Sequence, residues 1–221
     1  HTQSSAASDV YKRQERNKKD LQNLAKGINK KGFKCTPYPM DARNEAEIQE
    51  LFKTAAKQGK IECVIFNIGA NVFFPISKTT SRVFKKVWEM ATFAGFLTGK
   101  EAAKYMLKNK KGTIIFTGAT ASMRGSSGFS AFASAKFGLR AVAQSMAREL
   151  GPKGIHVAHT VIDGAIDHPW IKENFPDIYK LKKKDGILKP NEIAQVYLDL
   201  HNQQKSVWTH EIDLRPYMEK F

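Results

Sequence analysis

The chain has 221 residues, 42% of them hydrophobic, and its two cysteines lie far apart. This length favours one domain, the hydrophobic content excludes global disorder, and the cysteine count excludes a disulfide framework. No apolar run approaches the ~20 residues that a membrane helix needs, and no signal peptide is visible. We therefore expect a cytoplasmic protein with no membrane partner.

The net charge of +15 raises the question of a nucleic-acid partner. Only eight of the 36 basic residues are arginines, and the lysine clusters are not interleaved with aromatic residues. Lysine is a hydrated point charge that suits bidentate base recognition poorly. We therefore expect a solvated surface and no nucleic acid, although the charge would attract a phosphorylated cofactor.

Residues 1–14 show no periodicity that joins them to the rest, so we expect a non-native or disordered tail there and a single domain over 15–221. Hydrophobic spacing predicts the elements of that domain. They are a helix from Lys18 to the stop at Gly32, a strand at 33–38, a helix at 46–56, a strand at 61–67, a long helix at 81–107, a strand at 112–117, a helix at 131–150, a strand at 155–162, a helix at 191–201 and a strand at 207–214.

Strands alternate with helices through the whole domain, which is typical of a parallel sheet. Right-handed crossovers then place helices on both faces of the sheet. The fold class predicted is therefore α/β, a doubly wound parallel sheet.

Several motifs follow one another in a characteristic order. They are Asp41-Ala42, Phe66-Asn67-Ile68-Gly69, GTIIFTGATASMRGSSGFSAFASAK at 112–136, ARELGPKGIHV at 147–157 and Asp163-Gly164-Ala165-Ile166-Asp167-His168-Pro169. In this order and spacing the chain resembles the short-chain dehydrogenase/reductase family from about Gly32 to Leu214. The resemblance implies a Rossmann-like fold and hydride transfer between NAD(P) and the carbonyl or alcohol group of a small-molecule substrate.

The family opens with a strand and a loop of the form Gly-x-x-x-Gly-x-Gly, whose amides hold the cofactor's pyrophosphate. No such pattern occurs in the 221 residues. We therefore expect an N-terminally truncated domain that lacks this first strand and Gly-rich loop.

The resemblance implies a set of cofactor-binding positions and no metal site. The positions are Asp41, Ala42, Asn67, Gly69, Thr117, Lys136, Gly164 and Ile166. Arg16, if native, falls near the end of the family's second strand, where an arginine suits a 2′-phosphate. The cofactor expected is NADP or NAD, with NADP favoured.

Four side chains carry carbonyl reduction in the family: a Tyr that protonates the oxygen, a Lys four residues later, a Ser and an Asn. Here Phe132 stands at the Tyr position, Lys136 at the Lys position, Ala119 at the Ser position and Ala91 at the Asn position. A general acid is worth ~10²–10⁴ in rate, so its loss alone would nearly silence the reaction. Thr120, beside Ala119, is a candidate substitute hydroxyl, as Thr92 is beside Ala91.

A replacement acid could come from the end of the strand at 155–162, where Asp163, Asp167, His159 and His168 crowd together. Carboxyl ends of parallel strands are where ligands bind. The preferred interpretation is an NAD(P)-dependent oxidoreductase of altered or lost catalysis. The alternatives are an active enzyme with another proton source and a non-catalytic nucleotide-binding or subunit-interaction protein.

The resemblance also implies a homodimer or homotetramer. Family members commonly pair two long helices across a two-fold axis, which here would be those at 91–104 and 131–150. Small residues on these helices would permit close approach. They are Ala94, Gly95, Ala131, Ala135 and Gly138.

Overall fold

The computed structural model describes residues 18–69 and 71–219, which form a parallel sheet with helices on both faces. The sheet has the order β1-β2-β3-β4, and its strands are β1 (Cys63–Phe66), β2 (Gly112–Thr117), β3 (Ile155–Ile162) and β4 (Glu211–Leu214). Every pair is parallel, with Phe66 beside Phe116 and Phe116 beside His159. The carboxyl ends of all four strands therefore meet at one edge.

The helices of the described chain are distributed between and after these strands. They are α2 (Lys18–Asn29), α3 (Glu45–Ala56), α4 (Ser81–Trp88), α5 (Ala94–Asn109), α6 (Ser130–Leu150), α7 (Pro169–Asn174), α8 (Pro176–Lys180) and α9 (Pro190–Asn202). A π-helical turn, Glu89–Phe93, joins α4 to α5 without a break. Short 3-10 turns occupy Ile76–Lys78, Thr120–Ser122, Gly151–Lys153, Leu181–Lys184 and Lys205–Val207.

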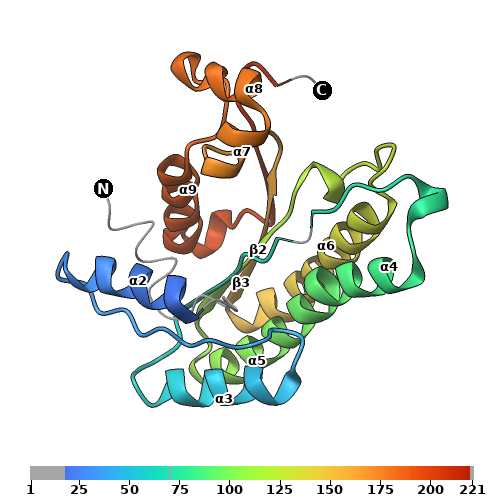
Figure 1. Ribbon diagram of the computed structural model, residues 1–221. Coiled ribbons are helices and arrows are strands. Elements are labelled where there is room, and N and C mark those ends of the chain that lie inside the picture. The colour runs from blue at the N-terminus through green and yellow to red at the C-terminus, as the bar shows by residue number, and fades with distance from the viewer. Residues whose placement is uncertain (1–17, 70, 220–221) are drawn as a thin grey trace.

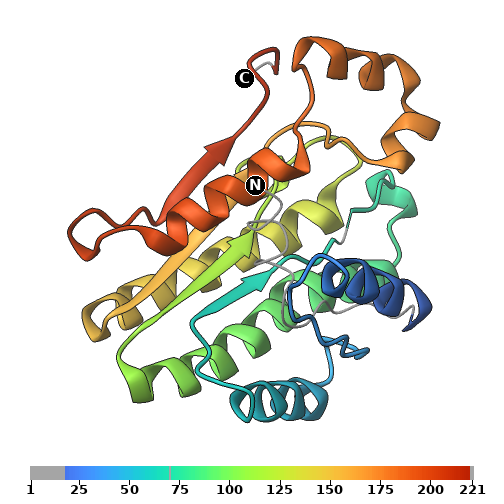
Figure 2. The same ribbon diagram turned by 90° about the vertical axis from the view of Figure 1, so that its left-hand side faces the viewer.

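The two faces of the sheet are covered by different helices, as Figures 1 and 2 show. Successive residues of a strand point to opposite faces. Ile114 packs in the core formed with α3, α5 and α6, whereas its neighbour Ile115 packs against Tyr197 and Leu200 of α9. The larger core therefore lies under α3, α5 and α6, and α9 closes the other face.

The Rossmann-like parallel fold predicted from the sequence is confirmed, but the strand predicted at 33–38 is wrong. These residues are irregular, because a strand needs a partner and β1 pairs only with β2 within the described chain. The last strand begins at Glu211 rather than at residue 207, since Lys205–Val207 forms a 3-10 turn. None of the helices in the described ranges is long and apolar enough to cross a bilayer.

Candidate functional site

Five of the predicted cofactor-binding residues lie at the carboxyl edge of the sheet. Asn67 and Gly69 follow β1 and are exposed, Thr117 ends β2, and Gly164 and Ile166 follow β3. Their shared position follows from the parallel register of the three strands. This edge is where open α/β sheets bind ligands.

Asp41 and Ala42 lie in the segment before α3. The Asp41 carboxylate accepts a hydrogen bond from Arg43 Nε at 2.9 Å, and Arg43 also lies 3.8 Å from Glu89 of the π-helical turn. Ala42 is buried in the main core. The Asp41 carboxylate is therefore engaged by its own neighbour, and Ala42 could meet a ligand only through its backbone. Arg16 lies outside the described residues.

Lys136, near the start of α6, is the most deeply buried cation described at this edge, at 3% exposure. Its Nζ donates to the carbonyl oxygen of Thr117 at 2.9 Å and to that of Ile68 at 3.3 Å. Burial lowers the pKa of the Lys136 ammonium to about 8. The side chain thus ties α6 to the ends of β1 and β2.

The position expected for the family's Asn is filled by apolar packing. Ala91 is fully buried in a cluster with Val87, Ala131 and Ala135. The hydroxyl of its neighbour Thr92 donates to the Ala135 carbonyl at 2.7 Å. Thr92 therefore holds the π-helical turn against α6 and does not present its hydroxyl to a ligand.

The residues expected at the positions of the family's Tyr and Ser, Phe132 and Ala119, carry no acidic proton. The ring centroid of Phe132 lies 6.0 Å from Lys136 Nζ. Ala119 precedes the Thr120–Ser122 turn, and its backbone N–H donates to Ser122 Oγ at 3.1 Å. The hydroxyl nearest to the Ser position on the cavity wall is that of Thr120.

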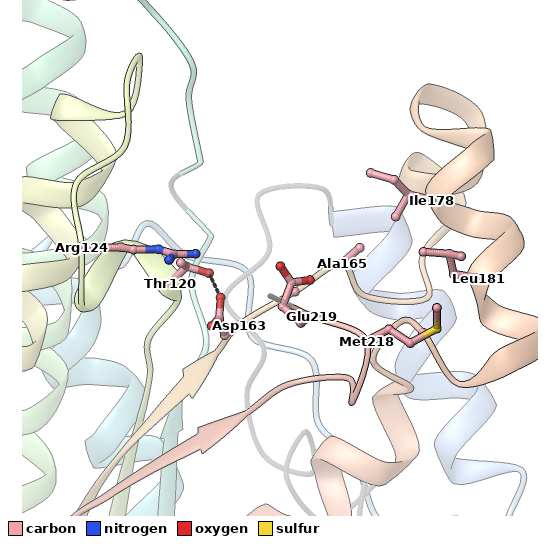
Figure 3. Close-up of a pocket in the computed structure, with 10 residues that line it drawn as sticks. Thr120, Arg124, Asp163, Ala165, Ile178, Leu181, Met218 and Glu219 are labelled. Atoms are coloured by element: carbon pink, nitrogen blue, oxygen red, sulfur yellow. Dashed lines mark hydrogen bonds between the residues drawn. The ribbon is translucent and has the colours of Figure 1, made fainter. Parts of the chain in front are cut away.

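Thr120 is joined to Asp163 by a short hydrogen bond, drawn in Figure 3. The other Asp163 oxygen, Oδ2, lies 3.0 Å from Nη2 of Arg215, which follows β4. Both carboxylate oxygens are therefore paired. Because Thr120 has one hydroxyl proton and donates it to Asp163, its oxygen can only accept a hydrogen bond from a ligand.

A cavity of about 330 Å³ opens beside this pair. Segments from the ends of β2, β3 and β4 and from the α8 region contribute to it, as Figure 3 shows. Its lining residues are Thr120, Arg124, Asp163, Gly164, Ala165, Ile178, Leu181, Gly186, Met218 and Glu219. This volume lies in the range of small-molecule sites.

The other candidate acids are engaged elsewhere. His168 caps α7, its Nδ1 accepting the Trp170 N–H at 3.1 Å. Asp167 pairs with Lys182 at 2.7 Å. Of the four residues expected to crowd the end of β3, only Asp163 lines the cavity.

His159 lies on β3, facing α6. Its Nδ1 is 2.9 Å from Glu211 Oε2, and both Glu211 oxygens accept from Arg140 at 2.7 Å. Burial lowers the pKa of His159 to about 4, so the ring is neutral at pH 7. Its Nε2 closely approaches Gly118, where a Cβ would sit 2.3 Å away. A glycine at the end of β2 is therefore what admits this imidazole.

Sequence reasoning missed Tyr197 of α9. Its hydroxyl lies 2.8 Å from Thr117 Oγ1 and 2.6 Å from Thr160 Oγ1, and burial raises its pKa. The only signal for it in the sequence is a tyrosine on the apolar side of a predicted helix. Tyr197 lies under the face of the sheet, and its hydroxyl links β2 to β3 through these two threonines. Because it is buried there and keeps its proton, it cannot replace the absent acid.

The described ranges contain no cluster of three or more His, Cys, Asp or Glu side chains able to hold a metal ion. The polar groups at the edge include one buried lysine, a Thr–Asp–Arg chain, Arg124, Glu219 and backbone carbonyls. Together they suit an organic ligand with hydroxyl or anionic groups.

Comparison with known proteins identifies the class. Residues 6–177 match the family model described as short chain dehydrogenase, and the chain belongs to this family. The match begins inside the segment 1–14, where a tail was expected; that segment lies outside the described residues, and the expectation stays untested.

Curated relatives of about 30% identity are known. One is (21S)-21-acetoxyl-apo-melianone synthase SDR of Melia azedarach, 30% identical over 171 residues that cover 72% of this chain and 62% of the relative. Another is peroxisomal 2,4-dienoyl-CoA reductase of Saccharomyces cerevisiae, 31% identical over 163 residues that cover 73% and 55%. The chain matches between 42% and 62% of the length of these and two further relatives.

Among solved structures, a short-chain dehydrogenase from Rhodopseudomonas palustris is 48% identical, with a TM-score of 0.78 over 94% of this chain and 85% of that one. A 7α-hydroxysteroid dehydrogenase solved with NADH is 22% identical, with a TM-score of 0.82 over 94% and 84%. The second likeness is one of fold alone.

Proposed function

We propose that the chain is a nicotinamide-dependent oxidoreductase whose carbonyl chemistry is altered or lost. The observation that carries the proposal is the site around Lys136. Lys136, which the resemblance puts at the position of the family's lysine, is buried at the sheet edge. The same resemblance puts Phe132, Ala119 and Ala91 at the positions of its three partners.

The residues at this edge fit the ribose next to the nicotinamide of a dinucleotide. The Lys136 ammonium has three protons and uses two on carbonyl oxygens, which leaves one for a ribose hydroxyl. Gly69 lies in open space after β1, where a ligand can approach the backbone. When bound, the dinucleotide would supply or accept the hydride. Solved relatives were crystallised with NADH and with 5-hydroxy-NADP.

We infer altered catalysis because neither Phe132 nor Thr120 can donate a proton to the substrate oxygen. Carbonyl reduction needs a proton on the substrate oxygen. Phe132 has none to give, and Thr120 donates its own to Asp163. A substrate oxygen bound at this site would lack the family's usual acid, and we expect rates lower by ~10²–10⁴.

NADP is the preferred dinucleotide in this proposal. The support is Arg16, whose guanidinium suits a 2′-phosphate, and the net charge of +15, which favours the more anionic cofactor. A tighter dissociation constant for NADH than for NADPH would reverse this preference.

The test is direct titration of the whole chain with NADPH and NADH, followed by energy transfer from its three tryptophans to the nicotinamide. Lys136→Met should weaken binding several-fold. Lys153→Met, at an exposed lysine near the opposite edge, is the matched control and should not. Failure to bind either dinucleotide would overturn the proposal, and ordinary family rates with ketones would overturn the altered catalysis.

A second candidate function, a subunit-interaction role, is favoured by exposed aromatic side chains on the outer surface of α4 to α6. Trp88, Phe96 and Phe137 all lie there. Large exposed apolar patches mark interaction sites. A homodimer through these helices is the partner we propose.

A further inference from the structure

The cavity at the carboxyl edge has two chemically different walls, visible on opposite sides of Figure 3. One carries Thr120, Arg124 and Asp163, and the other carries Ile178, Leu181 and Met218. Such a division selects ligands that are polar at one end and apolar at the other.

Arg124 is the cation on the polar wall that has no ion-pair partner among residues 18–69 and 71–219. Asp163, on the same wall, is already satisfied by Thr120 and Arg215. The guanidinium is a planar fork that matches a carboxylate through two parallel hydrogen bonds. Arg124 is exposed to solvent, and its guanidinium, unpaired within the described chain, has the chemistry to bind an anion.

Two exposed lysines near the cavity lack an ion pair among the described residues, although Asp177 and Asp185 lie in the same segment. Lys183 and Lys184 lie in the turn that follows α8, and within the described chain neither meets a carboxylate. Exposed charges of one sign around a pocket raise the local concentration of oppositely charged ligands.

Two carboxylates line the cavity, Asp163 and Glu219, and Glu219 is the one that neither Thr120 nor a short ion pair within the described chain engages. Its carboxylate interacts electrostatically with Arg215, and it faces the middle of the cavity in Figure 3. It should weaken the binding of an anion without preventing it, and this makes it a useful second probe.

The apolar wall offers contact area to a hydrocarbon chain. Ile178 and Met218 are both exposed, although each is a large hydrophobic residue. A ligand chain laid against them and Leu181 would gain roughly 25 cal/mol for each Å² of apolar surface that it removes from water.

We infer that the cavity takes an apolar monocarboxylate, with Arg124 holding the carboxylate and Ile178, Leu181 and Met218 contacting the hydrocarbon chain. Hydride transfer also needs a ketone or hydroxyl group, so the substrate class that this names for the proposed oxidoreductase site is a keto or hydroxy acid with an apolar chain. The inference rests on the proposed function only in treating the ligand as the substrate. Arg124 is then a specificity-determining residue.

The test uses octanoate and its neutral counterpart octanamide, titrated into the whole chain by calorimetry without any dinucleotide. Octanoate should bind at least roughly ten-fold more tightly than octanamide, because the bond to Arg124 is charge-assisted. Arg124→Gln should abolish that preference, whereas Glu219→Gln should tighten octanoate binding a few-fold. Arg148→Gln, at an exposed arginine near the far end of α6, is the control and should change neither.

Equal binding of the two ligands, or an octanoate affinity unchanged in Arg124→Gln, would overturn the inference. Absence of octanoate binding in a chain that binds NADPH would also overturn it while the proposed function stands. Selective octanoate binding in a chain that binds no dinucleotide would support the inference and sink the proposed function. Nuclear magnetic resonance spectra of the variants verify that each is folded.

Discussion

The charged residues at the carboxyl edge, and Glu211 at the start of β4, differ in how they are compensated. Asp163 has a hydroxyl and a guanidinium, and Glu211 has both donors of Arg140. Lys136 has two carbonyl oxygens and the ring of Phe132, 6.0 Å away, and no carboxylate in the described ranges pairs with it. A buried cation without a counter-charge is costly, because protein carbonyls replace only part of its hydration.

This cost predicts a pH dependence that belongs to Lys136. Its pKa falls from 10.5 to about 8 on folding, so below pH 8 both the folded and the unfolded chain carry the proton and the penalty is present in full. Between pH 8 and 10.5 the unfolded chain binds more protons, so the Lys136 contribution to the free energy of unfolding rises with pH, by about 3 kcal/mol in total. Urea unfolding of wild type and Lys136→Met at pH 7.5, 9 and 10.5 should show the wild type gaining on the variant. A constant difference would contradict this.

Restoring the missing phenol should not restore the enzyme. In Phe132→Tyr the new hydroxyl would stand near Lys136, but Ala119 still cannot orient a substrate oxygen and Thr120 still donates to Asp163. We expect the single variant to stay well below family rates with a panel of ketones and NADPH, and Phe132→Tyr/Ala119→Ser to exceed it. Full activity from the single change would show that the other positions do not matter.

The position expected for the family's Asn, which Ala91 occupies, cannot be restored by a single substitution. Ala91 is fully buried against Ala131 and Ala135, so an asparagine there would overpack the cluster. Overpacking of this kind costs about 1–3 kcal/mol. Ala91→Asn would therefore change stability as well as activity, and its effect on the reaction could not be separated.

At the scale of elements, the sequence predicts what depends on local pattern. The β-branched runs of β2 and β3 and the long helices α5 and α6 are found by periodicity alone. The short helices α7 and α8, of six and five residues, have too little pattern to be found. The segment 33–38 has strand-like composition, yet it needs a partner strand that composition does not supply.

The site divides in the same way. The position of Asp163 at the carboxyl edge could be predicted, because the hydrophobic pattern shows where the strand before it ends. Its partner Arg215 could not, because their contact depends on β4 lying beside β3. Thr117 and Tyr197 are 80 residues apart and meet only through the packing of α9 on the sheet.

That packing leads to a prediction for α9. Tyr197→Phe removes the hydroxyl that joins Thr117 to Thr160 and leaves polar groups in a buried place with fewer partners. We expect a loss of about 1–3 kcal/mol in the free energy of unfolding, measured with urea. Tyr217→Phe, at a side chain that is 78% exposed, is the matched control and should stay within about 0.5 kcal/mol of wild type. Equal stabilities for both variants would mean that α9 is held by its apolar contacts alone.

At the scale of the whole molecule, the small residues expected to permit close approach of two subunits have another role. A Cβ on Gly95 would sit 2.3 Å from Leu139, and one on Gly138 would sit 2.6 Å from Thr92. Ala94 and Ala135 are fully buried. These residues bring α5 and the π-helical turn close to α6 inside one chain, so the reason first given for a dimer is wrong.

A dimer through the same helices would instead use their outer aromatic side chains. Phe96 and Phe137 are 44% and 41% exposed on neighbouring helices, and Phe93 stacks between Trp88 and Phe96 with ring centroids 6.1 and 6.5 Å away. In Figure 1, α4, α5 and α6 lie on the same side of the sheet, away from α9. A two-fold axis across this surface would bury each aromatic residue against its own copy or a near neighbour.

We expect the wild-type chain to run as a dimer or tetramer in size-exclusion chromatography with light scattering, and Phe96→Glu/Phe137→Glu to run as a monomer. Two carboxylates brought to a two-fold interface would lose hydration and repel their symmetry mates, which costs far more than the interface gains from the remaining side chains. Trp170→Glu, at an exposed aromatic residue of α7 outside this surface, tests whether the added charge alone disperses the protein. A wild-type monomer would show that there is no such interface. An oligomer that persists in Phe96→Glu/Phe137→Glu would place the interface elsewhere. Either result would contradict the role that we assign to the aromatic surface.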